Sequence, residues 1–253
     1  MSGKLLTIYC HCAYYQIIPN GVKSAVLTAI KDSNIEFEAV ADLCQISAAR
    51  DPALKLWAKA ESIKIIACYP RAVRWLFHAG GAPLPQGGIE FFNMRVDSVE
   101  KIISSLAGDG MRSRSSKDTC TEKTGDWIPW FPVIDYDRCK NCKQCLNFCL
   151  FGVYKLSVEG KVEVCNPANC KTNCPACARL CPQSAIIFPK YSDSPINGDE
   201  VSESASGVSS EKMKAELASL LGGNVYDAIR RRSKNGKRFS RNADSKNFPQ
   251  AKL

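Results

Sequence analysis

Patterns of buried strands and amphipathic helices alternate along the first 107 residues. Apolar runs typical of strands cover residues 5–10, 37–43, 63–68 and 89–93. Helical patterns cover residues 22–31, 52–60, 71–79 and 98–106. Strands that alternate with helices in this way build parallel sheets. We therefore predict an α/β N-terminal domain with a four-stranded parallel sheet over residues 1–107.

The rest of the chain divides by its polarity. Residues 108–126 carry almost nothing to bury and are predicted to be a linker, as are the polar residues 191–210. Between these linkers, residues 127–190 regain short apolar segments, which predicts a second, α+β domain. Beyond them, residues 211–253 are predicted to form a short amphipathic helix and a basic tail.

The formal net charge of +9 comes mostly from the end of the chain, because residues 222–253 carry nine basic and two acidic side chains. Aromatic residues interleaved with the basic ones, which favour single-stranded nucleic acid, are nearly absent from this run, so no nucleic-acid partner is expected. The chain has no run of about 20 apolar residues and no signal-peptide pattern at its start. We therefore expect a cytoplasmic protein without a transmembrane segment.

Fourteen cysteines are the main chemical feature of the chain. The cytosol keeps thiols reduced, so metal or redox use is a better explanation than a disulfide framework. Nine of them lie between Cys139 and Cys181, and four lie before residue 70. Since the chain has only two histidines, any metal chemistry here is thiolate chemistry, which favours iron-sulfur clusters or zinc.

Two compact cysteine motifs stand in the second domain, each a triplet with a fourth cysteine after it. The first comprises Cys139, Cys142, Cys145 and Cys149, and the second comprises Cys170, Cys174, Cys177 and Cys181, followed by Pro182. Over residues 133–190 these motifs resemble bacterial ferredoxins with two [4Fe-4S] clusters. Zinc favours two separated pairs of ligands, so compact triplets fit it poorly.

The ferredoxin resemblance implies that each triplet shares a cluster with the fourth cysteine of the other motif. One set is Cys139, Cys142, Cys145 and Cys181, and the other is Cys170, Cys174, Cys177 and Cys149. The chain departs from the pattern at Leu150, where a proline usually stands, and by one extra residue after Cys170. Cys165 is an alternative to Cys170 as a ligand. Cys120, in the first linker, is expected to be a free thiol.

A second group of thiols follows the predicted strands of the α/β domain. Cys10 and Cys12 follow the first strand, and Cys44 and Cys68 close the second and third. The ends of parallel strands share one edge of a sheet, where open α/β sheets bind ligands. Arg71 and Arg95 are expected to bring positive charge to the same edge and so to help bind an anionic cluster or ligand there. The alternative is that these cysteines are only small buried apolar residues.

Over the first 95 residues, the elements CHC, ADLC, ACYPR and FNMR are similar to the N-terminal domain of the A subunit of heterodisulfide reductase. The resemblance implies a cluster-bearing α/β domain in an electron-transfer complex of anaerobes. We expect a third [4Fe-4S] cluster here, bound through Cys10, Cys12, Cys44 and Cys68. No G-x-G-x-x-G follows any strand, so neither FAD nor NAD is predicted on this chain, and a flavin would belong to a partner.

These patterns together predict an iron-sulfur electron-transfer subunit. It would relay single electrons between other redox subunits, including a flavoprotein, in a heterodisulfide-reductase-like or related anaerobic oxidoreductase complex. No nucleophile–base pair or paired carboxylate site is identifiable, so the subunit is predicted to be non-catalytic. The alternative is an enzyme subunit that reduces thiols or disulfides at the N-terminal cysteines.

Overall fold

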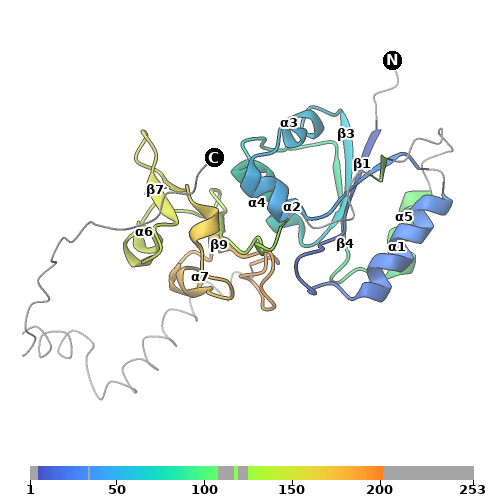
Figure 1. Cartoon of the computed structure of the whole chain (residues 1–253). Coiled ribbons are helices and arrows are strands. Elements are labelled where there is room, and N and C mark those ends of the chain that lie inside the picture. Colours follow the sequence, from blue (N-terminus) through green and yellow to red (C-terminus); the bar gives the residue numbers. More distant parts are fainter. Residues whose placement is uncertain (1–4, 34, 108–116, 119–124, 202–253) are drawn as a thin grey trace, which may run out of the picture. The chain divides into compact units, whose positions relative to one another are not determined.

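The computed structural model describes residues 5–33, 35–107, 117–118 and 125–201 (Figure 1). Cys120, the end of the predicted second linker, the amphipathic helix and the basic tail lie outside these residues. Residues 5–107 with 117–118 are called the α/β module below, and residues 125–201 the motif module. Both belong to one compact unit, Met1–Ser206.

The four predicted strands of the α/β module are confirmed. They are β1 (Leu5–Cys10), β2 (Phe37–Val40), β3 (Ser62–Ala67) and β4 (Ile89–Asn93). A fifth, β5 (Lys117–Asp118), comes from the predicted linker and pairs with β2. All five are parallel, in the order β4-β3-β1-β2-β5. The prediction therefore found the sheet but missed its edge strand, which is only two residues long.

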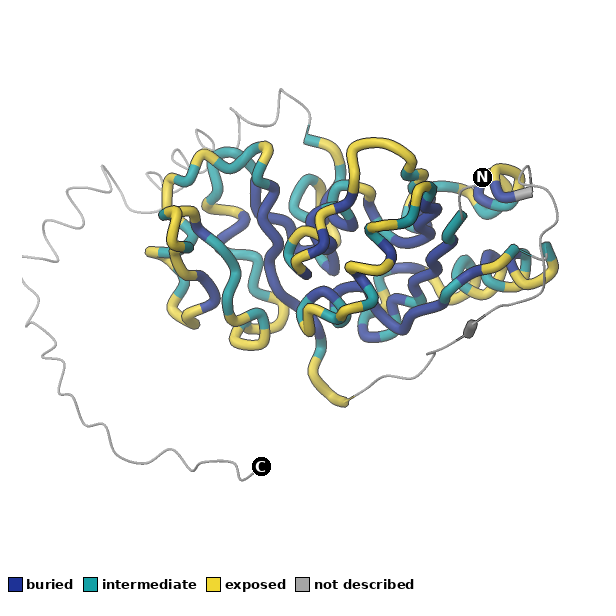
Figure 2. The backbone as a smooth tube through the Cα atoms, turned by 90° about the horizontal axis from the view of Figure 1, so that it is seen from above, coloured by how far each residue is buried: buried dark blue, intermediate teal, exposed yellow. Residues whose placement is uncertain are grey.

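Helices cover both faces of this sheet (Figure 1). On one face lie α1 (Asn20–Asp32) and α5 (Val99–Ala107), and on the other lie α2 (Leu43–Ala49), α3 (Ala53–Trp57) and α4 (Pro70–Ala79). The central strands β1, β2 and β3 are mostly buried between the two helical layers (Figure 2). Burial on both faces explains why the strands are continuous apolar runs rather than alternating ones.

The second predicted strand is too long, because β2 ends at Val40 and a helix that was not predicted starts soon after. Asp42 stops the strand by capping α2, with its side chain accepting a hydrogen bond from the Cys44 backbone N–H at 2.9 Å. Cys44 thus lies in the first turn of α2 and does not close a strand.

The motif module repeats one order of elements twice. Strand β6 (Val133–Ile134), a cysteine loop, α6 (Gln144–Phe148) and β7 (Tyr154–Leu156) form the first half. Strand β8 (Val162–Val164), a loop with the 3-10 turn η1 (Pro167–Asn169), α7 (Ala176–Leu180) and β9 (Ile186–Ile187) form the second. Antiparallel pairing joins β6 to β9 and β7 to β8. Because the first strand pairs with the last, the two halves interlock around a common core.

The start of the predicted second linker is part of the motif module's packing. The Phe188 N–H donates to the Ile196 carbonyl at 2.7 Å, and Asn197 is buried. The chain turns there at the cis peptide bond between Ser194 and Pro195. Residues 191–201 therefore close over the end of β9, where they also receive hydrogen bonds from the α/β module.

No helix within the described residues is both long enough and apolar enough to cross a membrane.

Candidate iron-sulfur sites

One cavity of the motif module, called cavity I, is lined by thiols of both motifs. Cys139, Cys142 and Cys145 come from the loop after β6 and the first turn of α6, and Cys181 directly follows α7. The Ala185 N–H donates to the Cys181 sulfur at 3.3 Å. The structure thus brings the first triplet together with the last cysteine of the second motif.

The loop of cavity I is held in shape by Asn141. Its backbone adopts a left-handed conformation with φ of 52°, which asparagine tolerates better than most residues. Its amide nitrogen donates to the Gly160 carbonyl at 2.8 Å, and its amide oxygen accepts from the Val162 N–H at 3.0 Å. This one side chain therefore ties the cysteine loop to the turn between β7 and β8.

A second cavity, cavity II, has a volume of about 410 Å³ and the complementary set of thiols. Its lining includes Cys149, Cys170, Cys174 and Cys177. The Tyr154 hydroxyl donates to the Cys177 sulfur at 3.1 Å. Cys149 comes from the first motif, so the two motifs exchange their fourth cysteines between the two cavities.

Cys165 lines neither cavity I nor cavity II. Its thiol donates to the Val153 carbonyl at 3.4 Å, at the end of β8. Cys170 stands in the wall of cavity II instead. Of the two alternatives that the sequence left open, the structure brings Cys170 to the other thiols.

Burial shifts the pKa values of three of the cavity thiols. Burial raises the pKa of Cys145 and Cys170 to about 12, and that of Cys177 to about 11. A thiol loses its proton when it binds a metal cation, because the positive charge of the metal stabilises the thiolate. Among the described residues, no group of three or more His, Cys, Asp or Glu is arranged for a single metal ion. The thiols are instead spread over the walls of each cavity.

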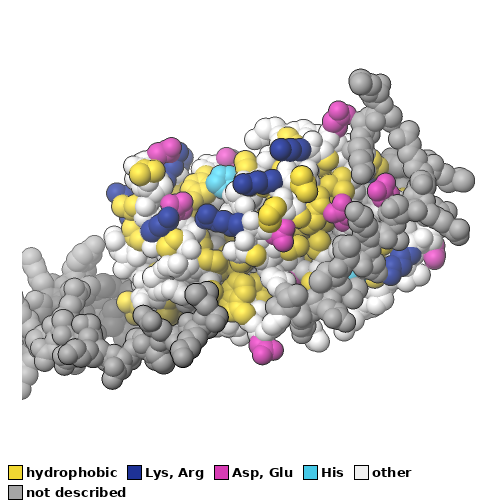
Figure 3. Space-filling view, turned by 45° about the horizontal axis from the view of Figure 1, so that its top comes forward, with side chains coloured by type: hydrophobic (Ala, Val, Ile, Leu, Met, Phe, Trp, Pro, Cys, Tyr) yellow, Lys and Arg dark blue, Asp and Glu magenta, His cyan; other side chains and the backbone are white. Residues whose placement is uncertain are grey.

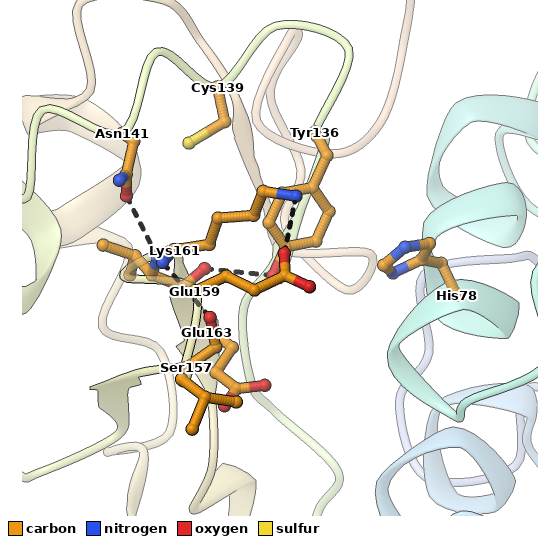
Figure 4. A pocket seen from close by; sticks show the side chains of 10 residues that line it. His78, Tyr136, Cys139, Asn141, Ser157, Glu159, Lys161 and Glu163 are labelled. Atoms are coloured by element: carbon orange, nitrogen blue, oxygen red, sulfur yellow. Dashed lines mark hydrogen bonds and ion pairs between the residues drawn. The ribbon is translucent and has the colours of Figure 1, made fainter.

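A cleft of about 460 Å³ lies beside cavity I (Figure 4). His78 of α4 faces it from one side, and the β7–β8 hairpin with Glu159 and Lys161 faces it from the other. The cleft and cavity I share Cys139 in their walls. Burial lowers the His78 pKa, although Asp137 opposes this shift. The cleft therefore reaches a wall of cavity I that carries a cysteine.

Apolar side chains surround the opening of cavity II. Leu150, the residue that replaces the usual proline, is 92% exposed, and Phe148 and Phe151 beside it are also exposed. On the face shown in Figure 3, basic and acidic side chains are mixed around apolar areas. Cavity II is thus bordered by apolar surface.

The four N-terminal cysteines lie at the carboxyl edge of the parallel sheet, and together they are called the thiol edge below. Cys10 ends β1, Cys12 follows it with φ of 47°, Cys44 starts α2, and Cys68 follows β3. The Leu43 N–H donates to the Cys10 sulfur at 3.3 Å. Burial raises the pKa of all four thiols, that of Cys68 to about 12.

Sequence reasoning missed two charged residues at the thiol edge, Asp42 and Lys190. They form an ion pair of 2.5 Å and are only 1% and 2% exposed. Asp42 belongs to the α/β module, and Lys190 follows β9 in the motif module. Aspartate is a residue type that suits a helix N-cap, but no local signal links Asp42 to a lysine 148 residues away.

Arg71, in the first turn of α4, and Arg95, which follows β4, both bind oxygen atoms of the motif module. The Arg71 side chain pairs with Asp135 and donates to the carbonyls of Ser184 and Pro195. Arg95 donates to the carbonyls of Tyr191 and Ser192, each at 3.1 Å. The observed role of both residues is thus to join the two modules.

Comparison with known proteins points to the motif module's class. The chain is 52% identical to an uncharacterized ferredoxin of Methanocaldococcus jannaschii over 63 residues, which are 24% of this chain and 42% of that protein. Pyruvate synthase subunit PorD of Methanothermobacter marburgensis is 31% identical over 77 residues, 30% of this chain and 88% of the subunit. The subunit of the same name from M. jannaschii is 33% identical over 64 residues and 72% of its length.

No protein-family model and no solved structure matches the chain. The interlocked halves and the relatives together define a module of the ferredoxin class, which implies iron-sulfur clusters and a role in electron transfer. Through this segment the chain belongs to the family of ferredoxin-like proteins that includes PorD. The chain spans less than half the length of the first relative.

Proposed function

We propose that this chain is an iron-sulfur electron-transfer subunit that relays single electrons through two [4Fe-4S] clusters of the motif module. The observation that carries the proposal is the exchange of fourth cysteines between cavities I and II. A bound cluster of this kind takes up and releases one electron at a time. The chain itself supplies the thiolates, the burial and the hydrogen bonds to sulfur.

The proposed ligands follow the lining of each cavity. Cavity I would use Cys139, Cys142, Cys145 and Cys181, and cavity II would use Cys149, Cys170, Cys174 and Cys177. Hydrogen bonds to the ligand sulfurs stabilise the extra negative charge of a reduced cluster and so raise its potential. The Ala185 N–H would do this in cavity I, and the Tyr154 hydroxyl in cavity II.

We further propose a third [4Fe-4S] cluster at the thiol edge, with ligands from Cys10, Cys12, Cys44 and Cys68. The support is that the structure gathers these thiols at one edge of the sheet, where Cys12 is close enough to raise the pKa of each of the other three. Arg95 adds positive charge near Cys12 and Cys68. The similarity to the N-terminal domain of the heterodisulfide reductase A subunit favours the same arrangement.

The proposed setting is a larger cytoplasmic oxidoreductase complex of an anaerobe, either heterodisulfide-reductase-like or related to it. PorD is by name a subunit of pyruvate synthase, so a ferredoxin-like relative can serve inside such an assembly. A flavin would belong to a partner subunit. The cleft beside Cys139 and the apolar border of cavity II are where partners could come close to the two proposed clusters.

Thiol or disulfide reduction at the thiol edge is the rival function. Thiolates are the reactive form in such chemistry, and burial here raises the pKa of every thiol of the edge. Cys10, Cys12 and Cys44 are also closed off from solvent. Both properties disfavour an exposed, reactive dithiol centre.

Anaerobic reconstitution of the full chain, followed by iron and sulfide quantification and electron paramagnetic resonance of the reduced protein, tests the proposal. We expect about eight irons from the motif module, and about twelve when the thiol edge is also loaded. Stoichiometric zinc, or the signal of a single cluster, would contradict the proposed relay.

A further inference from the structure

A lysine of the motif module lies inside the thiol edge of the α/β module. The Lys190 ammonium is 2.5 Å from the Asp42 carboxylate, and neither side chain has more than 2% of its surface exposed. Removing two charges from water costs several kcal/mol per ion, so such a pair is weak evidence for stability alone. The position of this ion pair beside Cys12 and Cys44 indicates a role in the electrostatics of the thiols.

Asp42 connects Lys190 to the helix that carries Cys44. One carboxylate oxygen accepts the Cys44 N–H at 2.9 Å, and the other accepts from Lys190. The carboxylate is thereby fixed in place at the first turn of α2. The position of the ammonium is consequently fixed relative to Cys44.

The charge of Lys190 acts mainly on three of the four thiols. Burial raises the pKa of Cys12 and Cys44, and among charged neighbours Lys190 is the strongest, acting to lower both values. It also lowers the pKa of Cys68, as does Arg95. For Cys10 the strongest charged neighbour is Asp42, which raises the pKa further. The ammonium thus lowers the pKa of Cys12, Cys44 and Cys68, whereas the Asp42 carboxylate is the strongest charged neighbour of Cys10.

We propose that Lys190 is the counter-cation of the thiol edge, supplied by the motif module to a site that the α/β module does not complete by itself. This inference rests on the proposed third [4Fe-4S] cluster and assigns the residue that balances its charge. A cubane with four thiolates carries a negative charge that grows by one on reduction. A cation fixed in a buried site offsets that charge far better than one in water.

The direction of the effect on the potential follows from this charge. Lys190 and Arg95 favour the reduced, more negative state and so raise the midpoint potential of the centre. Close to the thiol edge in sequence, the α/β module also contacts the second cysteine loop of the motif module. Tyr15, three residues after Cys12, donates its hydroxyl to the Asn173 side chain in the second cysteine loop at 3.0 Å. The proposed third centre therefore neighbours the relay through residues in contact.

The test compares variants of the full chain, reconstituted anaerobically. Lys190→Met removes the cation but leaves Asp42 buried and unpaired, which can destabilise the fold. The double variant Lys190→Met with Asp42→Asn removes both charges and keeps a residue that can cap α2. Lys190→Arg keeps the charge, and Lys161→Met removes an exposed lysine of the same module as a matched control.

We measure iron per chain and the midpoint potential of each cluster by redox titration with electron paramagnetic resonance. We expect the wild type, Lys190→Arg and Lys161→Met to hold about twelve irons. The double variant should lose about a third of them, or retain the third cluster at a more negative potential, with the two motif-module signals unchanged.

Two results would overturn the inference, and they are distinguishable. A double variant with the full iron content and an unchanged potential of the third centre would show that Lys190 has no such role, although the third cluster exists. A wild type with only about eight irons would remove the third cluster itself and with it the need for a counter-cation.

Discussion

The Arg71 guanidinium contacts the Asp135 carboxylate across the junction of the two modules, with 2.6 Å between Nε and Oδ2. Both side chains are largely buried, at 14% and 5% exposure. Asp135 also accepts the backbone N–H groups of Asp137 and Arg138, at the start of the first cysteine loop. Through Arg71, the α/β module thereby fixes Asp135, which holds the backbone at the start of the first cysteine loop.

Replacing Arg71 should therefore destabilise the protein strongly. Arg71→Met leaves the Asp135 charge buried and unpaired, which costs about 3–5 kcal/mol in comparable pairs. Anaerobic denaturant unfolding of the reconstituted protein measures the loss. The control Lys155→Met removes an exposed charge of the motif module and should change the unfolding free energy by less than about 1 kcal/mol. Equal effects of the two variants would show that the junction pair is not important for stability.

The exchange of fourth cysteines has a direct test in single substitutions. Cys181→Ser should impair the cluster of Cys139, Cys142 and Cys145, and Cys149→Ser should impair the other one. Each variant is expected to lose about four of the irons, measured by iron analysis and by the spectrum of the cluster that remains. Cys165→Ser is the matched control and should keep the full content, since Cys165 lines neither cavity. Damage restricted to the cluster of the same motif would refute the exchange.

The hydroxyl of Tyr154 should tune the cluster of cavity II. Tyr154→Phe removes the hydrogen bond to the Cys177 sulfur and leaves the ring in place. The bond is stronger to the more negative, reduced cluster, and a difference of about 1 kcal/mol between the two oxidation states lowers the potential by on the order of 40 mV when the bond is lost. A redox titration measures the shift, and the cluster of cavity I serves as the internal reference. An unchanged difference between the two potentials would contradict this role.

Asn141 should be required for the loop of cavity I. Asn141→Ala removes both hydrogen bonds to the β7–β8 hairpin and places a less tolerant residue at a positive φ. We expect weaker cluster retention in cavity I, measured as the rate of iron loss to a chelator at fixed temperature. Asn141→Gly relieves the backbone strain but not the lost bonds, so it should be affected as well. Retention equal to wild type in both variants would show that the loop holds its shape without this side chain.

The features predicted correctly depend on short stretches of sequence. The strands were visible because buried parallel strands are continuous apolar runs, and their order along the chain placed Cys10 and Cys68 at one edge. Cys44 was misplaced by one element, since the cap at Asp42 ends β2 early. The cysteine motifs could likewise be recognised from their spacing, because the shape of each ligand loop depends on only a few neighbouring residues.

The contacts between modules could not be predicted in the same way. Arg71 and Asp135 are 64 residues apart, and Asp42 and Lys190 are 148 apart. Nothing local distinguishes Lys190 from an ordinary surface lysine. Its burial depends on the packing of the chain after β9 against the thiol edge. The positive charge that Lys190 brings to this site was therefore found only in the structure.

The separation of Asp42 and Lys190 along the chain also has a consequence for how the protein matures. Domains fold in the order of their synthesis, so the α/β module can assemble its four thiols before residue 190 has left the ribosome. Until then, Asp42 has no ammonium beside it, and the edge lacks the cation that acts most strongly on Cys12 and Cys44. Insertion of the proposed third cluster is therefore expected to follow the folding of the C-terminal half of the motif module, which makes it a late step of biogenesis.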